Sequence, residues 1–237
     1  MKRSFIREIL ESIDENTISF AGGLPSENLF PKEDLKTAAV KIFDNPKAFQ
    51  YGLSNGIPEL REKIASRYTK EGFPTAKENI LITTGSQQAM YILAKFYESK
   101  DITIEEPSYL GAMNIFRLNH LKMHGIKLEK DGINIKDFKE SFKNTKLTYL
   151  IPDFQNPSAT TYCDEKRKEI AKIVSEENGI LIEDSPYSEL FFDKKNISIS
   201  SKIPKKSFHL GSFSKTLVPS LRIGWIRADE DLIKSLM

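Results

Sequence analysis

The chain has 237 residues, with 35 Lys or Arg against 33 Asp or Glu, so its formal net charge is only +2. This balance gives no broad basic surface for nucleic acid or an anionic membrane. The sequence has one cysteine and three histidines, which excludes a disulfide framework and disfavours a metal site built from Cys or His residues. No apolar run approaches the roughly 18 residues of a membrane span, and acidic Glu8, Glu11 and Asp14 stand where a signal peptide is apolar. We therefore expect a cytoplasmic protein without nucleic-acid or membrane partners.

The first 78 residues hold helical candidates that are separated by turns rich in Gly and Pro. These candidates are Phe5–Ile13, Lys32–Ile42 and Gly56–Glu71. We interpret this region as an N-terminal arm or the start of a smaller lobe. We assign residues 1–45 to the arm, or to part of a small domain, and residues 46–237 to a large domain.

Short apolar runs alternate with helical stretches after residue 78. Strands are expected at Asn79–Thr83, Ile102–Glu105, Leu121–Leu128, Lys146–Ile151, Gly179–Glu183, Phe208–Leu210 and Arg222–Ala228. Helices are expected at Ser86–Tyr97, after Pro107–Ser108 through Asn119, and at Asp164–Asn178. This alternation predicts an α/β fold with a mostly parallel, seven-stranded sheet that helices cover on both faces.

Polar or glycine-containing turns follow several of these strands, where an open α/β sheet binds its ligands. Thr84–Gln87 opens a helix, and its glycine and free amides suit a phosphate, although an N-cap by Ser86 explains it equally well. Tyr109 can stack on a flat ring and Asn156 follows the fourth strand, but packing and a plain turn are the alternatives. Asp184 ends an apolar run, so we expect a partly buried carboxylate that needs a donor or a cation.

The stretch Ser212–Thr216, followed by Pro219 and Leu221–Trp225, places Lys215 in a turn of small residues seven positions before Arg222. A lone lysine in a polar turn is usually a solvated surface residue. Near desolvating or cationic neighbours, however, its pKa falls and it can form a Schiff base with a carbonyl. Together with the phosphate turn, the tyrosine, the amide and the buried carboxylate, this lysine completes the set that pyridoxal 5′-phosphate requires.

The sequence resembles the class I/II aminotransferases of PLP fold type I. The Ser-x-Ser-Lys stretch with its Leu-Arg-Ile-Gly-Trp continuation carries the resemblance, as does Ile18–Pro25 with Phe30–Pro31. The latter resembles in particular the branch that contains 2-aminoadipate aminotransferases and the effector domains of MocR-type regulators. The similarity extends in order from Ile18 to Trp225, and it implies the PLP-binding large domain of that fold.

The resemblance also implies individual roles. Lys215 is the lysine that binds PLP and moves the substrate's Cα proton. The cofactor-binding set is Asp184 at the pyridine nitrogen, Tyr109 on the ring, Asn156 and Tyr187 at the ring oxygen, and Gly85, Ser86, Gln87, Ser212, Ser214 and Arg222 at the phosphate.

The resemblance also assigns roles to Tyr51, at a neighbouring subunit, and to Gly23, at the substrate. Tyr51 corresponds to a tyrosine that reaches the phosphate of a neighbouring subunit, so a homodimer with shared sites is expected. Gly23, with Asn156, lies on the substrate side. Three residues match no motif position and are interpreted as structural or surface residues: His120, His124 and Cys163.

The implied activity moves an amino group from a 2-aminoadipate-type, aromatic or branched-chain amino acid to a 2-oxo acid such as 2-oxoglutarate. Family members continue into a C-terminal small domain with an arginine for the substrate carboxylate. Here Arg222 is assigned to the phosphate and Arg227 matches no motif, so we expect this domain to be absent and the 237-residue chain to be a poor or inactive transaminase. The alternatives are other PLP chemistry such as a β-lyase, a ligand-sensing module of a regulator, and a remnant without catalysis.

Overall fold

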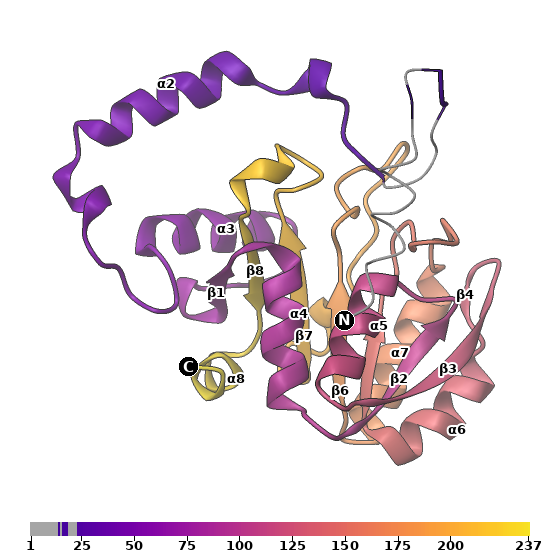
Figure 1. The fold of residues 1–237 in the computed structure, drawn as a ribbon. Coiled ribbons are helices and arrows are strands. Elements are labelled where there is room, and N and C mark those ends of the chain that lie inside the picture. Colours follow the sequence, from indigo (N-terminus) through magenta and orange to yellow (C-terminus); the bar gives the residue numbers. More distant parts are fainter. Residues whose placement is uncertain (1–13, 15, 19–22) are drawn as a thin grey trace.

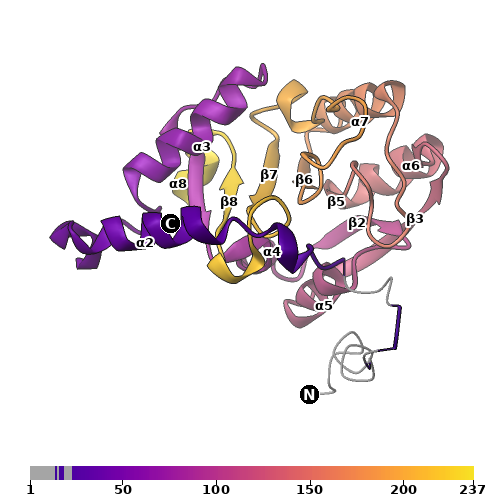
Figure 2. The same cartoon turned by 90° about the horizontal axis from the view of Figure 1, so that it is seen from above.

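An eight-stranded sheet runs through the computed structural model, which describes residue 14, residues 16–18 and residues 23–237 (Figure 1). Its strands are β1 (Ile80–Thr83), β2 (Asp101–Glu106), β3 (Lys122–Glu129), β4 (Gly132–Ile133), β5 (Leu147–Leu150), β6 (Ile180–Asp184), β7 (Ser207–Ser212) and β8 (Gly224–Arg227). The spatial order is β1-β8-β7-β6-β5-β2-β3-β4, and Figure 2 shows the run from β8 to β3 from above. Strands β7, β6, β5, β2 and β3 pair in parallel, whereas β1, β8 and β4 pair antiparallel. The predicted α/β fold with a mostly parallel sheet is confirmed.

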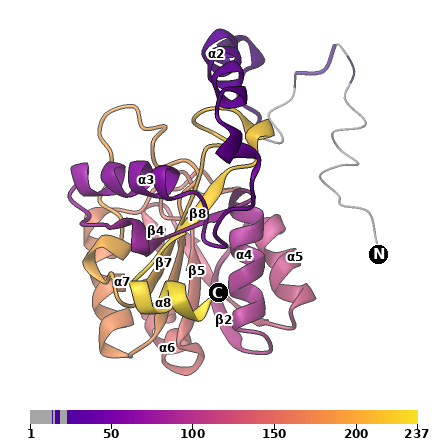
Figure 3. The ribbon, with the colours of Figure 1, turned by 90° about the vertical axis from the view of Figure 1, so that its left-hand side faces the viewer.

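Helices cover both faces of this sheet. They are α3 (Pro58–Lys70), α4 (Gly85–Phe96), α5 (Leu110–Leu118), α6 (Ile135–Thr145), α7 (Asp164–Glu176) and α8 (Glu230–Ser235). A further helix, α2 (Lys32–Phe43), does not pack on the sheet and contributes no buried residue. Figure 3 shows α4 and α5 on one side of the sheet and α3 and α7 on the other. Short 3-10 turns lie at η1 (Glu27–Leu29), η2 (Pro46–Phe49), η3 (Lys77–Asn79), η4 (Ser200–Lys202) and η5 (Pro219–Leu221).

The structure adds elements that the sequence reading missed. The two-residue β4 and the helices α6 and α8 were not expected, although each helix has a sequence signal at its start. Asn134 accepts a hydrogen bond from the amide of Asp137 at 3.0 Å, and Asp229 caps α8 in the same way. The expected strand at Arg222–Ala228 is shorter than predicted, because Arg222 adopts a left-handed conformation with φ +52°. The helix expected at Phe5–Ile13 lies outside the described residues.

Apolar side chains on the two faces of the sheet form separate cores. Leu93 of α4, Phe116 of α5 and Ile233 of α8 are buried against Phe208 on one face. On the other, residues of α6 and α7 such as Phe142 pack over β5 and β6. Since each such buried side chain contributes about 1.5–3 kcal/mol, these two layers hold the sheet and the loops at its edge in place.

Two adjacent acids on β6 serve opposite faces of the sheet, because successive side chains of a strand alternate. Glu183 accepts hydrogen bonds from the amides of Ile199 and Ser200, at 3.0 and 2.6 Å, and so anchors η4 beneath the sheet. Asp184 points to the other face. Both carboxyl groups are almost completely buried.

Helix α2 and the short turns η1 and η2 on either side of it project away from the sheet (Figure 1). Helix α2 contributes no buried residue, and its Val40, Ile42 and Phe43 side chains are exposed. The expected boundary between residues 45 and 46 stays a prediction. Within the described residues, no helix combines the length and the apolar character that crossing a bilayer requires.

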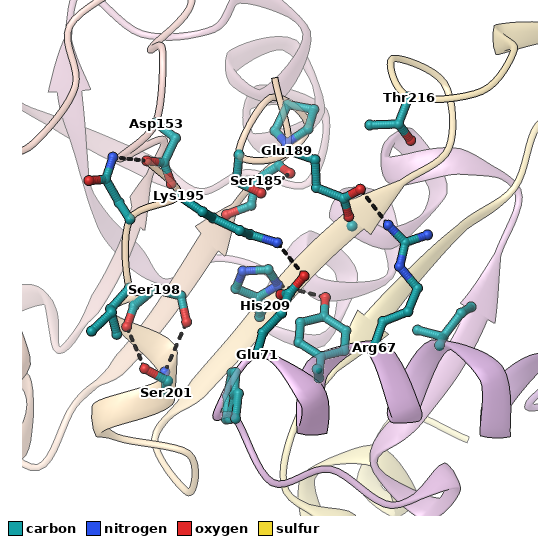
Figure 4. A pocket seen from close by; sticks show the side chains of 18 of the residues that line it. Arg67, Glu71, Asp153, Ser185, Glu189, Lys195, Ser198, Ser201, His209 and Thr216 are labelled. Carbon is teal, nitrogen blue, oxygen red and sulfur yellow. Dashed lines mark hydrogen bonds and ion pairs between the residues drawn. The ribbon is translucent and has the colours of Figure 1, made fainter. Parts of the chain in front are cut away.

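Helix α3 is joined to the sheet by a buried chain of hydrogen bonds beside a cavity of about 390 Å³ (Figure 4). Trp225 Nε1 donates to the Tyr68 hydroxyl at 2.7 Å, and that hydroxyl lies 2.9 Å from His209 Nδ1. Charged side chains of this cavity pair with one another, as in the Lys195–Glu71 ion pair at 2.7 Å. Burial and the nearby Arg227 charge lower the pKa of His209 to about 3.

This buried histidine predicts a pH dependence of stability. In the unfolded chain His209 binds a proton below about pH 6.5, whereas in the folded protein it stays neutral until about pH 3. The free energy of unfolding therefore falls as the pH is lowered from about 6.5 toward 3, by at most about 1.4 kcal/mol per pH unit from this residue. Asp184 and Glu105, whose pKa values burial raises to about 6 and about 7, act in the opposite direction. Only a comparison with a variant isolates the histidine.

Urea unfolding at pH 7 and pH 5 measures this effect. We expect the His209→Gln variant to lose less unfolding free energy than the wild type between these pH values. The exposed His120 provides the matched control, because His120→Gln should behave like the wild type. An equal loss in wild type and His209→Gln would contradict the assignment.

Candidate active site

A cleft of about 1300 Å³ lies at the edge of the sheet where the parallel strands end. Asp184 is the last residue of β6, Asn156 follows β5 and Tyr109 follows β2. Seven of the predicted site residues line this cleft: Gly23, Ser86, Tyr109, Asn156, Asp184, Tyr187 and Lys215. Segments that are distant in sequence therefore meet at one place, as the strand pattern predicted.

Lys215 lies in the loop after β7 with its ammonium group in the cleft. Its Nζ donates a hydrogen bond to the carbonyl oxygen of Gly23 at 2.7 Å and lies 5.8 Å from the centre of the Tyr187 ring. Burial lowers the pKa of this lysine, because desolvation disfavours the charged form. The amine is thus closer to its neutral, nucleophilic state than a surface lysine is.

Asp184 presents one satisfied and one unsatisfied oxygen. Its Oδ2 accepts a hydrogen bond from the Tyr149 hydroxyl at 2.7 Å, whereas Oδ1 is buried with no hydrogen-bond partner among the described residues. Burial raises the pKa of this carboxyl to about 6. A buried polar atom without a partner costs about 1–3 kcal/mol, so Oδ1 is suited to a ligand that brings a donor.

Two side chains of the cleft wall, Tyr109 and Tyr187, each take part in a side-chain hydrogen bond. Gln87 Nε2 donates to the Tyr109 hydroxyl at 2.9 Å, which links the start of α4 to the start of α5. Asn156 Nδ2 lies 3.5 Å from the Tyr187 hydroxyl. Burial raises the pKa of both tyrosines, so each keeps its hydroxyl proton at neutral pH. The cleft therefore offers aromatic rings, an amide and hydroxyl donors.

The N-terminus of α4 forms a cradle with the loops after β7 and η5. Gly85 has φ +74°, and a Cβ atom placed there would lie 2.6 Å from Nη2 of Arg222. Ser212 Oγ accepts a hydrogen bond from the amide of Ser214 at 3.0 Å, and the two hydroxyls are 2.9 Å apart. Free helix amides, hydroxyls and a guanidinium in one place are the groups that bind a phosphate.

Glu105 organises the loop that carries Asn156. One of its oxygens accepts from the Ile151 amide at 2.9 Å and the Tyr162 hydroxyl at 2.7 Å, and the other accepts from Gln155 Nε2 at 2.9 Å. This network was not predicted from the sequence, and neither was the contact of Tyr149 with Asp184. The pattern of buried strands could place Tyr149 in the sheet but not identify its partner.

Tyr51 is not part of this cleft. Its side chain is fully exposed in the segment between η2 and α3, so its role at a neighbouring subunit stays a prediction. Of the residues interpreted as structural, His124 pairs with Asp101 at 3.0 Å, His120 is exposed, and Cys163 is partly buried. In the described part of the chain, no group of three or more His, Cys, Asp or Glu residues is arranged to hold a metal ion.

Comparison with known proteins relates this arrangement to one family. Residues 16–237 match the family described as aminotransferase class I and II. The chain is 32% identical to aromatic-amino-acid aminotransferase 1 of Thermococcus litoralis, over 100% of this chain and 60% of that protein. It is 33% identical to 2-aminoadipate transaminase of Thermus thermophilus, over 100% of this chain and 62% of that protein.

A solved structure gives the same result. The alpha-aminoadipate aminotransferase of Thermus thermophilus, complexed with N-(5′-phosphopyridoxyl)-L-leucine, matches with a TM-score of 0.88 and 34% identity over 99% of this chain and 61% of that chain. The chain thus spans about 60% of the length of these relatives. Since the family match extends over nearly the whole sequence, the chain belongs to the class I and II aminotransferase family.

Proposed function

We propose that this protein is a pyridoxal 5′-phosphate-dependent aminotransferase. The observation that carries the proposal is that one cleft contains both the half-buried amine of Lys215 and the buried carboxylate of Asp184. The Oδ1 atom of this carboxylate has no partner among the described residues. The family membership supports it, as does the phosphopyridoxyl ligand of the similar Thermus thermophilus structure. PLP, when bound, supplies a ring that withdraws electrons from the substrate's Cα.

The residues of the cleft fit this group. Asp184 Oδ1 would accept from the pyridine nitrogen, the Tyr109 ring would stack on the pyridine, and Asn156 and Tyr187 would donate to the ring oxygen. The phosphate would lie at the cradle, which consists of Gly85, Ser86, Gln87, Ser212, Ser214 and Arg222. The unpartnered Oδ1 and the close approach of the Arg222 guanidinium to Gly85 are the features that support this orientation.

Lys215 has two roles in this proposal. Its desolvated amine would hold the cofactor, and the same amine would move a proton to and from the substrate's Cα. The lowered pKa of this lysine favours both, because a neutral amine is the form that attacks and that accepts a proton. The Gly23 carbonyl, which accepts the hydrogen bond of Lys215, lines the cleft, and we propose that Gly23 faces the substrate.

The substrates and the assembly are proposed from the relatives. Their names favour a 2-aminoadipate-type or aromatic donor, and we propose a 2-oxo acid such as 2-oxoglutarate as acceptor. We further propose a homodimer in which exposed Tyr51 reaches the partner's phosphate, since exposed Phe49 and Leu53 lie beside it in sequence. A β-lyase reaction on the same cleft predicts a 2-oxo acid together with ammonia and a released side-chain group, which product analysis distinguishes from amino transfer. The cytoplasmic location stays a prediction.

Lys215 should carry the cofactor. Incubation of the protein with PLP, reduction with borohydride and peptide mapping should place the label on Lys215, because its amine is the desolvated one in the cleft. The Lys215→Ala variant should remain unlabelled under the same conditions. A label spread over surface lysines, and unchanged in that variant, would sink the proposal.

Asp184 should matter more for chemistry than for retention of the cofactor. In Asp184→Asn the pyridine nitrogen loses its charged partner while the phosphate contacts remain. In a full-length version of the protein, we expect single-turnover amino transfer from 2-aminoadipate to slow by about a hundredfold or more, the usual loss when a preorganised electrostatic partner is removed. Stopped-flow absorbance measures the rate and fluorescence titration the PLP affinity. Near-normal turnover of the variant contradicts this role.

Gly85→Ala should weaken PLP binding through the displacement of Arg222. The matched control is Gly72→Ala: Gly72 has φ +81°, close to the φ of +74° at Gly85, but a Cβ there would meet nothing within 4 Å. Both variants pay a similar backbone strain, and only Gly85→Ala moves the guanidinium. We expect at least a tenfold higher PLP dissociation constant for Gly85→Ala and an unchanged one for Gly72→Ala. Equal affinities in the two variants would exclude the cradle as the phosphate site.

A further inference from the structure

Tyr149 lies in the middle of the sheet, outside every motif that the sequence reading singled out. On β5 it is opposite Ile182 of β6, and on the other side it is opposite Ile104 of β2. Its side chain is completely buried, and the ring of Phe116 packs edge-on against it with the ring centroids 5.2 Å apart. The phenol is therefore held in one orientation by both neighbouring strands and by α5.

The register explains why this phenol meets Asp184. Tyr149 is level with Ile182, and Asp184 is two residues farther along β6 on the same face of the sheet. The tyrosine's one hydroxyl proton is donated to Asp184 Oδ2 at 2.7 Å. This bond fixes the plane of the carboxylate, and it leaves Oδ1 as the atom of Asp184 that lacks a partner among the described residues.

We propose that Tyr149 is a positioning residue: it holds Asp184 Oδ2 so that the ionised carboxylate presents Oδ1 to the pyridine nitrogen of the cofactor. This inference rests on the proposed function. A phenylalanine would fill the same volume without a buried polar group, so packing alone does not explain the hydroxyl. Without it, Oδ2 would be buried and unpaired, the carboxylate would hold a proton more strongly, and the proton shared with the ring would shift from nitrogen to oxygen.

The chain offers a matched control in Tyr162. This tyrosine is equally buried, and its hydroxyl donates to another buried carboxylate, Glu105, at the same 2.7 Å. Tyr149→Phe and Tyr162→Phe each remove one hydroxyl from such a pair. Loss of stability should be comparable in both variants, whereas an effect on the ring nitrogen should be confined to Tyr149→Phe.

The experiment loads the purified protein with PLP labelled with ¹⁵N at the ring and records the nitrogen chemical shift at neutral pH. In the wild type we expect the shift of a protonated pyridine. In Tyr149→Phe it should move toward the unprotonated value, because a carboxylate that has lost its hydrogen-bond donor holds the shared proton more strongly. Tyr162→Phe should keep the wild-type shift. In an Asp184→Asn background, Tyr149→Phe should add no further change.

The outcomes separate the two proposals. If the wild type does not bind PLP through Lys215, the proposed function fails. If it does, and the nitrogen shift is the same in the wild type and Tyr149→Phe, or moves equally in Tyr162→Phe, the positioning role is overturned. Should Tyr149→Phe fail to fold, 3,5-difluorotyrosine at position 149 keeps the ring and the hydroxyl but alters the hydrogen bond, and an unchanged nitrogen shift then overturns the role.

Discussion

The side chains of the cleft come together because neighbouring parallel strands end at the same edge of the sheet. β2, β5 and β6 deliver Tyr109, Asn156 and Asp184 to that edge, and the loop after β7 delivers Lys215. The site therefore depends on side chains from several segments that are distant in the sequence. The two apolar cores, one on each face of the sheet, contribute to function indirectly. They fix the positions of the strands relative to one another, and so the positions of the side chains at the strand ends.

Two buried carboxylates at this edge, those of Glu105 and Asp184, have different roles. Glu105 has three donors from the neighbouring loop and tyrosine, so its hydrogen-bonding capacity is used within the protein. Asp184 accepts one hydrogen bond, from Tyr149, and its Oδ1 has no partner among the described residues. The same desolvation raises the pKa of both groups. What distinguishes them is the number of partners that the fold supplies, and this number could not be read from the sequence.

The sequence predicted local features well where residue type limits the possibilities. Apolar runs located seven strands, and the turns after them located Lys215, Asp184 and Tyr109 in one cleft. It failed where the outcome depends on tertiary contacts. Arg222 was expected in a strand, yet it takes a left-handed turn beside Gly85, and Tyr149 was treated as an ordinary strand residue although its hydroxyl reaches Asp184. Such pairings depend on strand register, which no local pattern encodes.

The back-to-back acids of β6 make this strand intolerant of changes in length. Glu183 anchors η4 on one face and Asp184 serves the cleft on the other, so removal of a single residue within β6 would exchange their faces. The carboxylate that reached the cleft would then be the longer glutamate, and the amides of Ile199 and Ser200 would lose their acceptor. Sequence change in this strand is thus limited to substitutions.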